Sequence, residues 1–239
     1  MSEQDPSDRS LPALRRDQLR RVDELAVTEL GMPTSLLMEN AGRGAAESIL
    51  RRYASTGGPA LILCGAGNNG GDGMVIARQL LCHGFAVELI HQHPPARLRG
   101  DAGIQRAIVD RLPIPAHTLE GQGSTLTEHL SRATLILDGL LGTGFSGDLR
   151  PDLLVVLDQI EAARSLTGSR VIALDIPSGM DCDTGQPSPR CVRADLTLSF
   201  CAAKVGFSAP GARDWTGEIE QIGLGVPAGT IRSWLDSEG

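Results

Sequence analysis

The sequence predicts an α/β fold built on a doubly wound, mainly parallel sheet, with helices on both faces and two helices ahead of it. Five short and continuously apolar runs recur along the chain, as is typical of strands buried on both faces. Segments with helical periodicity separate several of these runs. That alternation predicts β-α-β units, and therefore parallel strands.

The expected elements begin with two helices. Arg15 to Leu30 carries apolar residues at helical spacing, and a second helical pattern runs from about Thr34 to Tyr53. A Gly-Gly-Pro break at 57–59 leads into the first apolar run. Strands are expected at 60–64, 86–90, 134–137, 171–174 and 196–200, and polar loops at 121–127 and 187–193.

Length and composition indicate one globular domain. The chain has 239 residues, of which 41% are hydrophobic and 21% charged. We expect the domain to span 13–230, between a flexible N-terminal tail, 1–12, and a C-terminal tail, 231–239. Neither polar loop is long enough to separate two domains.

Charge and cysteine usage exclude several classes of partner. The net charge is -7 and no basic stripe alternates with aromatic residues, so no nucleic-acid partner is expected. The five cysteines form no C-x-x-C pair, which argues against a disulfide framework and a zinc cage. No signal-peptide pattern or membrane-length apolar run is present, so we expect a cytoplasmic protein without a membrane partner.

A glycine-rich loop follows the first predicted strand directly. Its sequence, GAGNNGGDG at 65–73, precedes the helical segment MVIARQLLCHG and contains G-x-G-x-x-G. Glycines allow a close approach to phosphate, and the next helix offers N–H groups to an anion. The pattern alone is weak, and a turn that serves only packing is the alternative. Asn68, Asn69 and Asp72 favour a site, because packing has no use for three polar side chains there.

Two later strands also end in an aspartate. The strand before LDGLLGTGFSGDLR ends at Asp138, and the strand before the IPSGMD turn ends at Asp175, with Ser178 in the turn. Each aspartate alone could be a turn cap or a structural residue. Parallel strands place such loops at one sheet edge, where ligands bind in open α/β sheets.

An ordinary NAD-dependent oxidoreductase is disfavoured. The second strand closes with His91, Gln92 and His93, where a dinucleotide fingerprint has an acidic residue for the ribose hydroxyls. No apparatus for hydride transfer is evident either. A metal role for His91 and His93 lacks a third ligand.

Taken together, these motifs closely resemble the NAD(P)H-hydrate epimerase family, also called the YjeF N-terminal domain family. The resemblance covers nearly the whole chain and includes LLMENAGRGAAE, GNNGGDG, LDGLLGTGFSGDLR, DIPSGMD and RADLTLSFCAAKVGF. It implies a Rossmann-like fold, a homodimer and epimerisation of hydrated NADH and NADPH. Many bacterial members are fused to a dehydratase domain. This chain stops soon after Pro227, so we expect it to act with a separate NAD(P)H-hydrate dehydratase.

Carried over position by position, the resemblance implies a substrate site and a potassium (K+) site. The potassium ligands are Asn69, Asp138 and Ser178, oxygen donors suited to a hard cation. The substrate-binding positions are Asn68, Asn69, Gly70, Gly71, Asp72, Gly142, Thr143, Gly144, Phe145, Ser146, Gly147, Asp148 and Asp175.

The family's reaction inverts a hydroxyl-bearing hemiaminal carbon next to the ring nitrogen, by way of an iminium or a ring-opened aldehyde. Either route needs proton transfer to and from one oxygen. We hypothesise that Asp175 and Asp138 are the catalytic pair, with Asp175 transferring the proton and Asp138 holding the cation. Lys204, in the CAAK stretch, could contact a phosphate or be a solvated charge. Glu39, in the MENAG segment, could be a site residue, a helix cap or a solvated residue. A catalytically silent binding module of the same fold is the alternative function.

Overall fold

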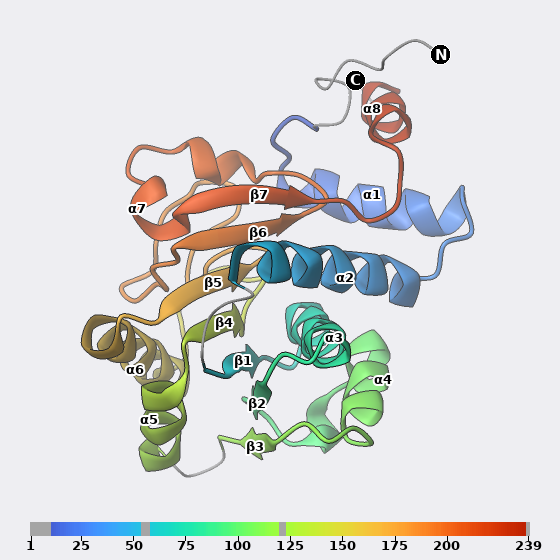
Figure 1. Ribbon diagram of the computed structural model, residues 1–239. Coiled ribbons are helices and arrows are strands. Elements are labelled where there is room, and N and C mark those ends of the chain that lie inside the picture. Colours follow the sequence, from blue (N-terminus) through green and yellow to red (C-terminus); the bar gives the residue numbers. More distant parts are fainter. Residues whose placement is uncertain (1–10, 54–57, 120–122, 238–239) are drawn as a thin grey trace.

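The computed structural model describes residues 11–53, 58–119 and 123–237, which form one seven-stranded sheet with helices on both faces (Figure 1). The strands are β1 (Ala60–Cys64), β2 (Val87–His91), β3 (Ala116–Thr118), β4 (Leu135–Gly139), β5 (Arg170–Leu174), β6 (Leu196–Phe200) and β7 (Glu218–Ile222). The helices are α1 (Arg16–Thr28), α2 (Thr34–Tyr53), α3 (Asn68–Cys82), α4 (Gly100–Val109), α5 (Gly123–Arg132), α6 (Pro151–Thr167), α7 (Arg213–Thr216) and α8 (Ala228–Asp236), with short 3-10 turns at Pro95–Arg97 and Val205–Ser208.

All the strand pairs are parallel, in the order β3-β2-β1-β4-β5-β6-β7. The chain winds outward from β1 to one edge and then from β4 to the other. The order therefore reverses between β1 and β4, and a crevice is expected at their carboxyl ends. The predicted doubly wound architecture is confirmed.

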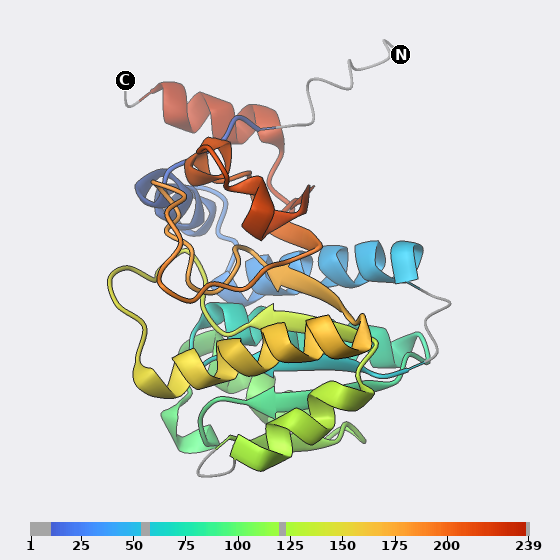
Figure 2. The same cartoon turned by 90° about the vertical axis from the view of Figure 1, so that its left-hand side faces the viewer.

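The two faces of the sheet carry separate apolar cores. In β1, Ile62 packs with the core under α1 to α4, whereas Leu61 and Leu63 pack with the core under α5 and α6. This alternation explains why the strand reads as continuously apolar, since both of its faces are buried. Figure 2 shows α5 and α6 lying across one face, with the other helices behind or above.

Local signals set the helix ends. α6 begins with Pro151 in its first turn and is followed by Gly168 at φ +71°, the left-handed conformation that closes a helix and suits glycine. α2 and α3 pack closely: a β-carbon on Gly42 would lie 2.5 Å from the Val75 side chain. These two helices form one wall of the crevice.

Several expectations of the sequence analysis were wrong or incomplete. Residues 123–127, expected in a polar loop, begin α5, and the edge strands β3 and β7 were not predicted. Residues 231–236, assigned to a C-terminal tail, belong to α8, where Ile231 is buried. In the N-terminal tail, Leu11 is buried, while residues 1–10 lie outside the described residues.

Within the described ranges, no helix combines the length and the apolar character needed to cross a membrane.

Candidate active site

A cleft of about 570 Å³ lies at the carboxyl edge of the sheet, where the crevice was expected. The size is within the usual range for small-molecule sites, about 300 to 1,000 Å³. The loops after β1, β4, β5 and β6 line it together with α1 and α2. Its polar and glycine lining includes Arg20, Asp23, Gly67, Asn68, Asn69, Asp72, Gln92, His93, Asp101, Gly142, Thr143, Gly144, Arg150, Asp175 and Lys204.

The glycine-rich loop enters α3 earlier than expected. α3 begins at Asn68, so the NNGGD residues form its first turns instead of belonging to a loop that ends at Gly73. A β-carbon on Gly70 would lie 2.0 Å from the carbonyl oxygen of Gly65, which makes glycine necessary for this tight entry. The first turn of a helix has N–H groups without intrahelical partners, and Asn68 and Asn69 place this turn on the cleft.

Asp138 is fully buried beneath the cleft and is held by the turn after β5. Its Oδ1 accepts a hydrogen bond from Ser178 Oγ at 2.6 Å, and its Oδ2 accepts one from the Ser178 N–H at 2.8 Å. Burial raises the pKa of Asp138 to about 6, although the hydrogen bonds from Ser178 and Leu140 lower it. The carboxyl group therefore titrates much nearer neutrality than an exposed aspartate.

Leu141 connects Asp138 and Ser178 to Asn69. The Leu141 N–H donates to Ser178 Oγ at 2.9 Å, and Asn69 Nδ2 donates to the Leu141 carbonyl at 2.7 Å. Asn69 Nδ2 also donates to the Leu174 carbonyl at 3.0 Å. The three residues implied as potassium ligands thus belong to one network.

The side-chain oxygen of Asn69, Oδ1, has no hydrogen-bond partner in this network. Because both contacts of Nδ2 are to carbonyl oxygens, the amide orientation is fixed, and Oδ1 is buried without a hydrogen bond. A buried acceptor left unpaired costs about 1 to 3 kcal/mol. An unsatisfied oxygen in the same network as a buried carboxyl group fits a hard cation, so the residues present are compatible with potassium.

Asp175 lies on the cleft and forms an ion pair with a buried lysine. Lys204 Nζ is 2.5 Å from Asp175 Oδ1 and also donates to the carbonyls of Phe200 and Ala202. Lys204 is 1% exposed, which excludes the reading of a solvated charge. Asp175 Oδ2 faces Gly142, since a β-carbon there would lie 3.8 Å from it.

Two residues on the cleft have unusual backbone conformations. Asp175 has φ +67° and Cys201 has φ +65°, and both are outside the range that side-chain-bearing residues normally adopt. Each such conformation costs about 1 to 3 kcal/mol and persists only when surrounding contacts enforce it. Here the enforcing contacts include the Asp175 N–H bond to Leu198 and the Phe200 N–H bond to Asp175 Oδ1.

Asp72 is a second carboxyl group on the cleft. Burial raises its pKa well above the ordinary value, and the nearby carboxylates of Asp175 and Asp23 raise it further. Asp72 is thus a buried carboxyl group with a raised pKa, whereas Asp175 is paired with Lys204. Two carboxyl groups in such different environments are suited to separate acid and base roles.

The structure separates the predicted site residues into three groups. Asn68, Asn69, Asp72, Asp175 and the residues from Gly142 to Phe145 line the cleft. Asp138 and Ser178 lie beneath it, and Gly70 and Gly71 are buried packing positions. Ser146, Gly147 and Asp148 are exposed and do not line the cleft.

Other candidates have different places. Glu39 pairs with Arg78 and Gln79 and so ties α2 to α3 outside the cleft lining. His91 is buried and His93 contacts Arg150, so the two histidines do not act together. The sequence analysis missed Arg20 and Asp23, which project from α1 into the cleft. Their place in the cleft depends on how α1 packs in the folded protein, which the sequence pattern did not indicate.

Proteins of known families resemble this chain over most of its length. The family model described as YjeF-related protein N-terminus matches residues 34–206. A protein of Rhodopirellula baltica named NAD(P)H-hydrate epimerase is 42% identical over 94% of this chain and 88% of its own length. A protein of Pirellula staleyi with the same name is 36% identical over 89% of this chain and 92% of its own length.

Longer relatives and a solved structure extend the comparison. A protein of Moorella thermoacetica named bifunctional NAD(P)H-hydrate repair enzyme Nnr is 34% identical over 88% of this chain, which spans 40% of that protein. The crystal structure of yeast YNL200c shares the fold at TM-score 0.74 and 22% identity, over 83% of this chain and 84% of that one. The match of the family model over residues 34–206 shows that the chain belongs to the YjeF-related protein N-terminus family.

Proposed function

We propose that the protein is an NAD(P)H-hydrate epimerase, an isomerase that interconverts the R and S epimers of hydrated NADH and NADPH. Asp175 is the observation that carries the proposal. It lies on a nucleotide-sized cleft beside a glycine-rich helix start, with Oδ1 held by Lys204 and Phe200. Its Oδ2, on the side of Gly142, is left to exchange a proton with the substrate.

The reaction requires a hydroxyl group to leave one face of the hemiaminal carbon and to return on the other. A proton must reach that oxygen as it leaves and be removed as water returns. Asp175 exchanges this proton through Oδ2, and Asp72, whose pKa is raised by burial, is a second carboxyl group on the cleft. Lys204 positions Asp175 by its ion pair.

The helix start and the loop after β4 bind the diphosphate side of the substrate. Backbone N–H groups at Asn68 and Asn69 offer donors to an anion, and Gly142 and Gly144 let the backbone approach it closely. Asp138 lies beneath this surface and does not touch the substrate. Its proposed role is therefore restricted to holding the cation.

We propose potassium as the cofactor. Asn69 Oδ1, the Asp138 carboxylate and Ser178 Oγ would hold it, and the unsatisfied Asn69 oxygen supports this choice. When bound, potassium would supply fixed positive charge beside the diphosphate side of the cleft.

We also propose a homodimer that acts in the cytoplasm beside a separate dehydratase. Exposed Val27, Leu30 and Leu36 near the turn between α1 and α2 offer an apolar surface for a second copy. The five free cysteines suit a reducing compartment. Static light scattering of the purified protein tests the dimer, and a monomeric mass would reject it.

A coupled assay tests the activity. Purified R hydrate is mixed with a dehydratase that consumes only the S hydrate, and the loss of substrate is followed with and without the protein. We expect the protein to make consumption of the R hydrate faster and complete. Tight binding of the hydrate without any acceleration would reject the epimerase and favour the silent binding module.

A further inference from the structure

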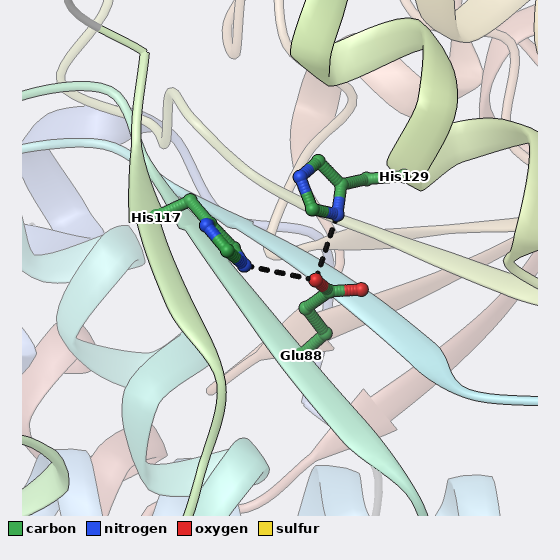
Figure 3. Close-up of side chains that lie close together, drawn as sticks. All are labelled: Glu88, His117 and His129. Atoms are coloured by element: carbon green, nitrogen blue, oxygen red, sulfur yellow. Dashed lines mark ion pairs between the residues drawn. The ribbon is translucent and has the colours of Figure 1, made fainter.

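Three side chains that commonly bind metals meet near the β3 edge of the sheet (Figure 3). Glu88 lies in β2, His117 in β3 and His129 in α5. Glu88 Oε1 is 2.7 Å from His129 Nδ1 and 3.1 Å from His117 Nε2. None of the three lines the cleft described above, so the cluster is a separate feature.

The sheet register brings these side chains together. His117 is paired with Ile90 in the parallel ladder, and Ile90 is two residues from Glu88. Side chains of paired residues, and of residues two apart on a strand, point to the same face. Ile90 packs in the core with Leu126 and Leu130 of α5, so this is the face that α5 covers. His129 reaches it from the helix above.

Glu88 is a mostly buried carboxyl group that faces two imidazole nitrogens. Its side chain is 12% exposed, and a charge this buried needs a partner. Arg132 Nη2 also lies 3.3 Å from His129 Nδ1. The contact of the same Nδ1 with Glu88 requires a proton or a shared cation between the two atoms. A metal ion bound by both groups would satisfy the nitrogen and the carboxylate together once the two atoms, which are 2.7 Å apart, separate slightly.

We propose that Glu88, His117 and His129 form a binding site for one divalent transition-metal ion of the zinc type. Two imidazole nitrogens and one carboxylate oxygen are a donor set that zinc uses in proteins, and they favour it over magnesium or calcium. The three ligand atoms lie within 4.8 Å of one another. Tetrahedral zinc with bonds of about 2.0 to 2.1 Å separates its ligands by roughly 3.4 Å. On metal binding, Glu88 Oε1 must therefore move slightly away from both imidazole nitrogens, which lie 2.7 and 3.1 Å from it.

The fourth coordination position is open to water. His117 is 48% exposed, so the site faces solvent on that side. The ion would join β3, which has only three residues, and α5 to the longer strand β2. Its role is therefore to fasten this edge of the sheet, and metal binding should raise the stability of the folded protein.

Metal titration of the tag-free, EDTA-treated protein tests the proposal. We expect one Zn²⁺ per chain by isothermal titration calorimetry, a higher Tm with Zn²⁺, and visible absorption typical of tetrahedral Co²⁺ when Co²⁺ is used. His117→Ala and His129→Ala should each weaken binding at least tenfold. Epimerisation by the metal-free His117→Ala variant should match that of the metal-free wild type, so failure of this site and failure of the proposed function are distinguishable.

The control is His83→Ala, which removes an exposed histidine whose Nδ1 contacts the carbonyl of Gln79 in the same helix turn. This variant should bind the metal like the wild type, and far-UV circular dichroism should show that all variants are folded. Absence of saturable binding in the wild type would overturn the proposal. So would binding that survives both histidine substitutions.

Discussion

Asp175→Asn tests the proposed proton transfer with little change of shape. Asparagine has nearly the same volume, and its carbonyl oxygen can still accept from Lys204 Nζ and the Phe200 N–H. The positive φ of this position is also tolerated by asparagine. The substitution therefore removes the oxygen that is proposed to exchange the proton, while the wall of the cleft remains.

The expected effects on rate and stability differ in size. Loss of general acid-base help lowers kcat/KM about 100- to 10,000-fold, which corresponds to about 3 to 5 kcal/mol. Removal of one partner from a buried ion pair costs about 3 to 5 kcal/mol. Here Lys204 keeps two carbonyl acceptors and the asparagine oxygen, so we expect about 1 to 3 kcal/mol. At about 2 to 4 °C per kcal/mol, Tm should fall by roughly 2 to 12 °C.

The assay combines the coupled epimerisation rate, Tm and substrate binding on the same preparation. Asp158→Asn is a matched control, because Asp158 is exposed, pairs with Arg190 and is not part of the cleft. It should keep the wild-type rate. An Asp175→Asn variant that is folded, binds the hydrate and epimerises at the wild-type rate would refute the assignment of Asp175.

Three further predictions concern the cation, the helix start and pH. Replacing K+ by Li+ should lower wild-type activity, and Asn69→Ala should abolish this difference; equal activity of the wild type in both salts would reject the cofactor. Gly70→Ala should lower Tm, because its β-carbon meets a backbone oxygen at 2.0 Å, whereas Gly67→Ala, whose β-carbon meets nothing within 4 Å, should not. Burial lowers the pKa of His91 to about 4, below the value of about 6.5 in the unfolded chain. Between these two pH values the unfolded chain binds more protons than the folded protein, so the free energy of unfolding falls as the pH falls. In urea unfolding between pH 7.5 and 4.5, His91→Leu should remove up to about 3 kcal/mol of that loss, and an unchanged pH dependence would contradict this prediction.

The sequence predicted those parts of the fold that depend on local apolar pattern. β1, β4 and β5 are buried on both faces, so their apolar runs stand out. β7 reads EIEQI, with only two apolar residues, and its Glu218 and Glu220 pair with arginines of α2. Because this pairing depends on a distant helix, the pattern of the strand alone did not reveal it.

α5 was missed for a different reason. Its first residues, glycine, serine and threonine, are typical of loops, although Leu126 and Leu130 further along anchor the helix in the core. Tertiary packing of these leucines overrides the weak local preference. A longer window that included both leucines would have indicated a helix.

The site was predictable where motifs carry it and unpredictable where distant segments meet. The strand-end aspartates and Asn69 were found because their loops leave one edge of a parallel sheet. The pairing of Lys204 with Asp175 joins residues 29 positions apart on different strand-end loops, and Asp23 comes from a helix ahead of the sheet. The sequence pattern also did not show that Asp175 lines the cleft whereas Asp138 is buried beneath it.

The central claim is that this cleft inverts the hydroxyl-bearing carbon of the hydrated nicotinamide. The most direct measurement starts from the pure R hydrate, without a dehydratase, and follows the R to S ratio by chromatography that resolves the two epimers. The account predicts that catalytic amounts of the protein speed the approach to the same equilibrium ratio from either epimer, and that Asp175→Asn does so at least 100-fold more slowly. An approach to equilibrium no faster than in buffer alone would contradict it.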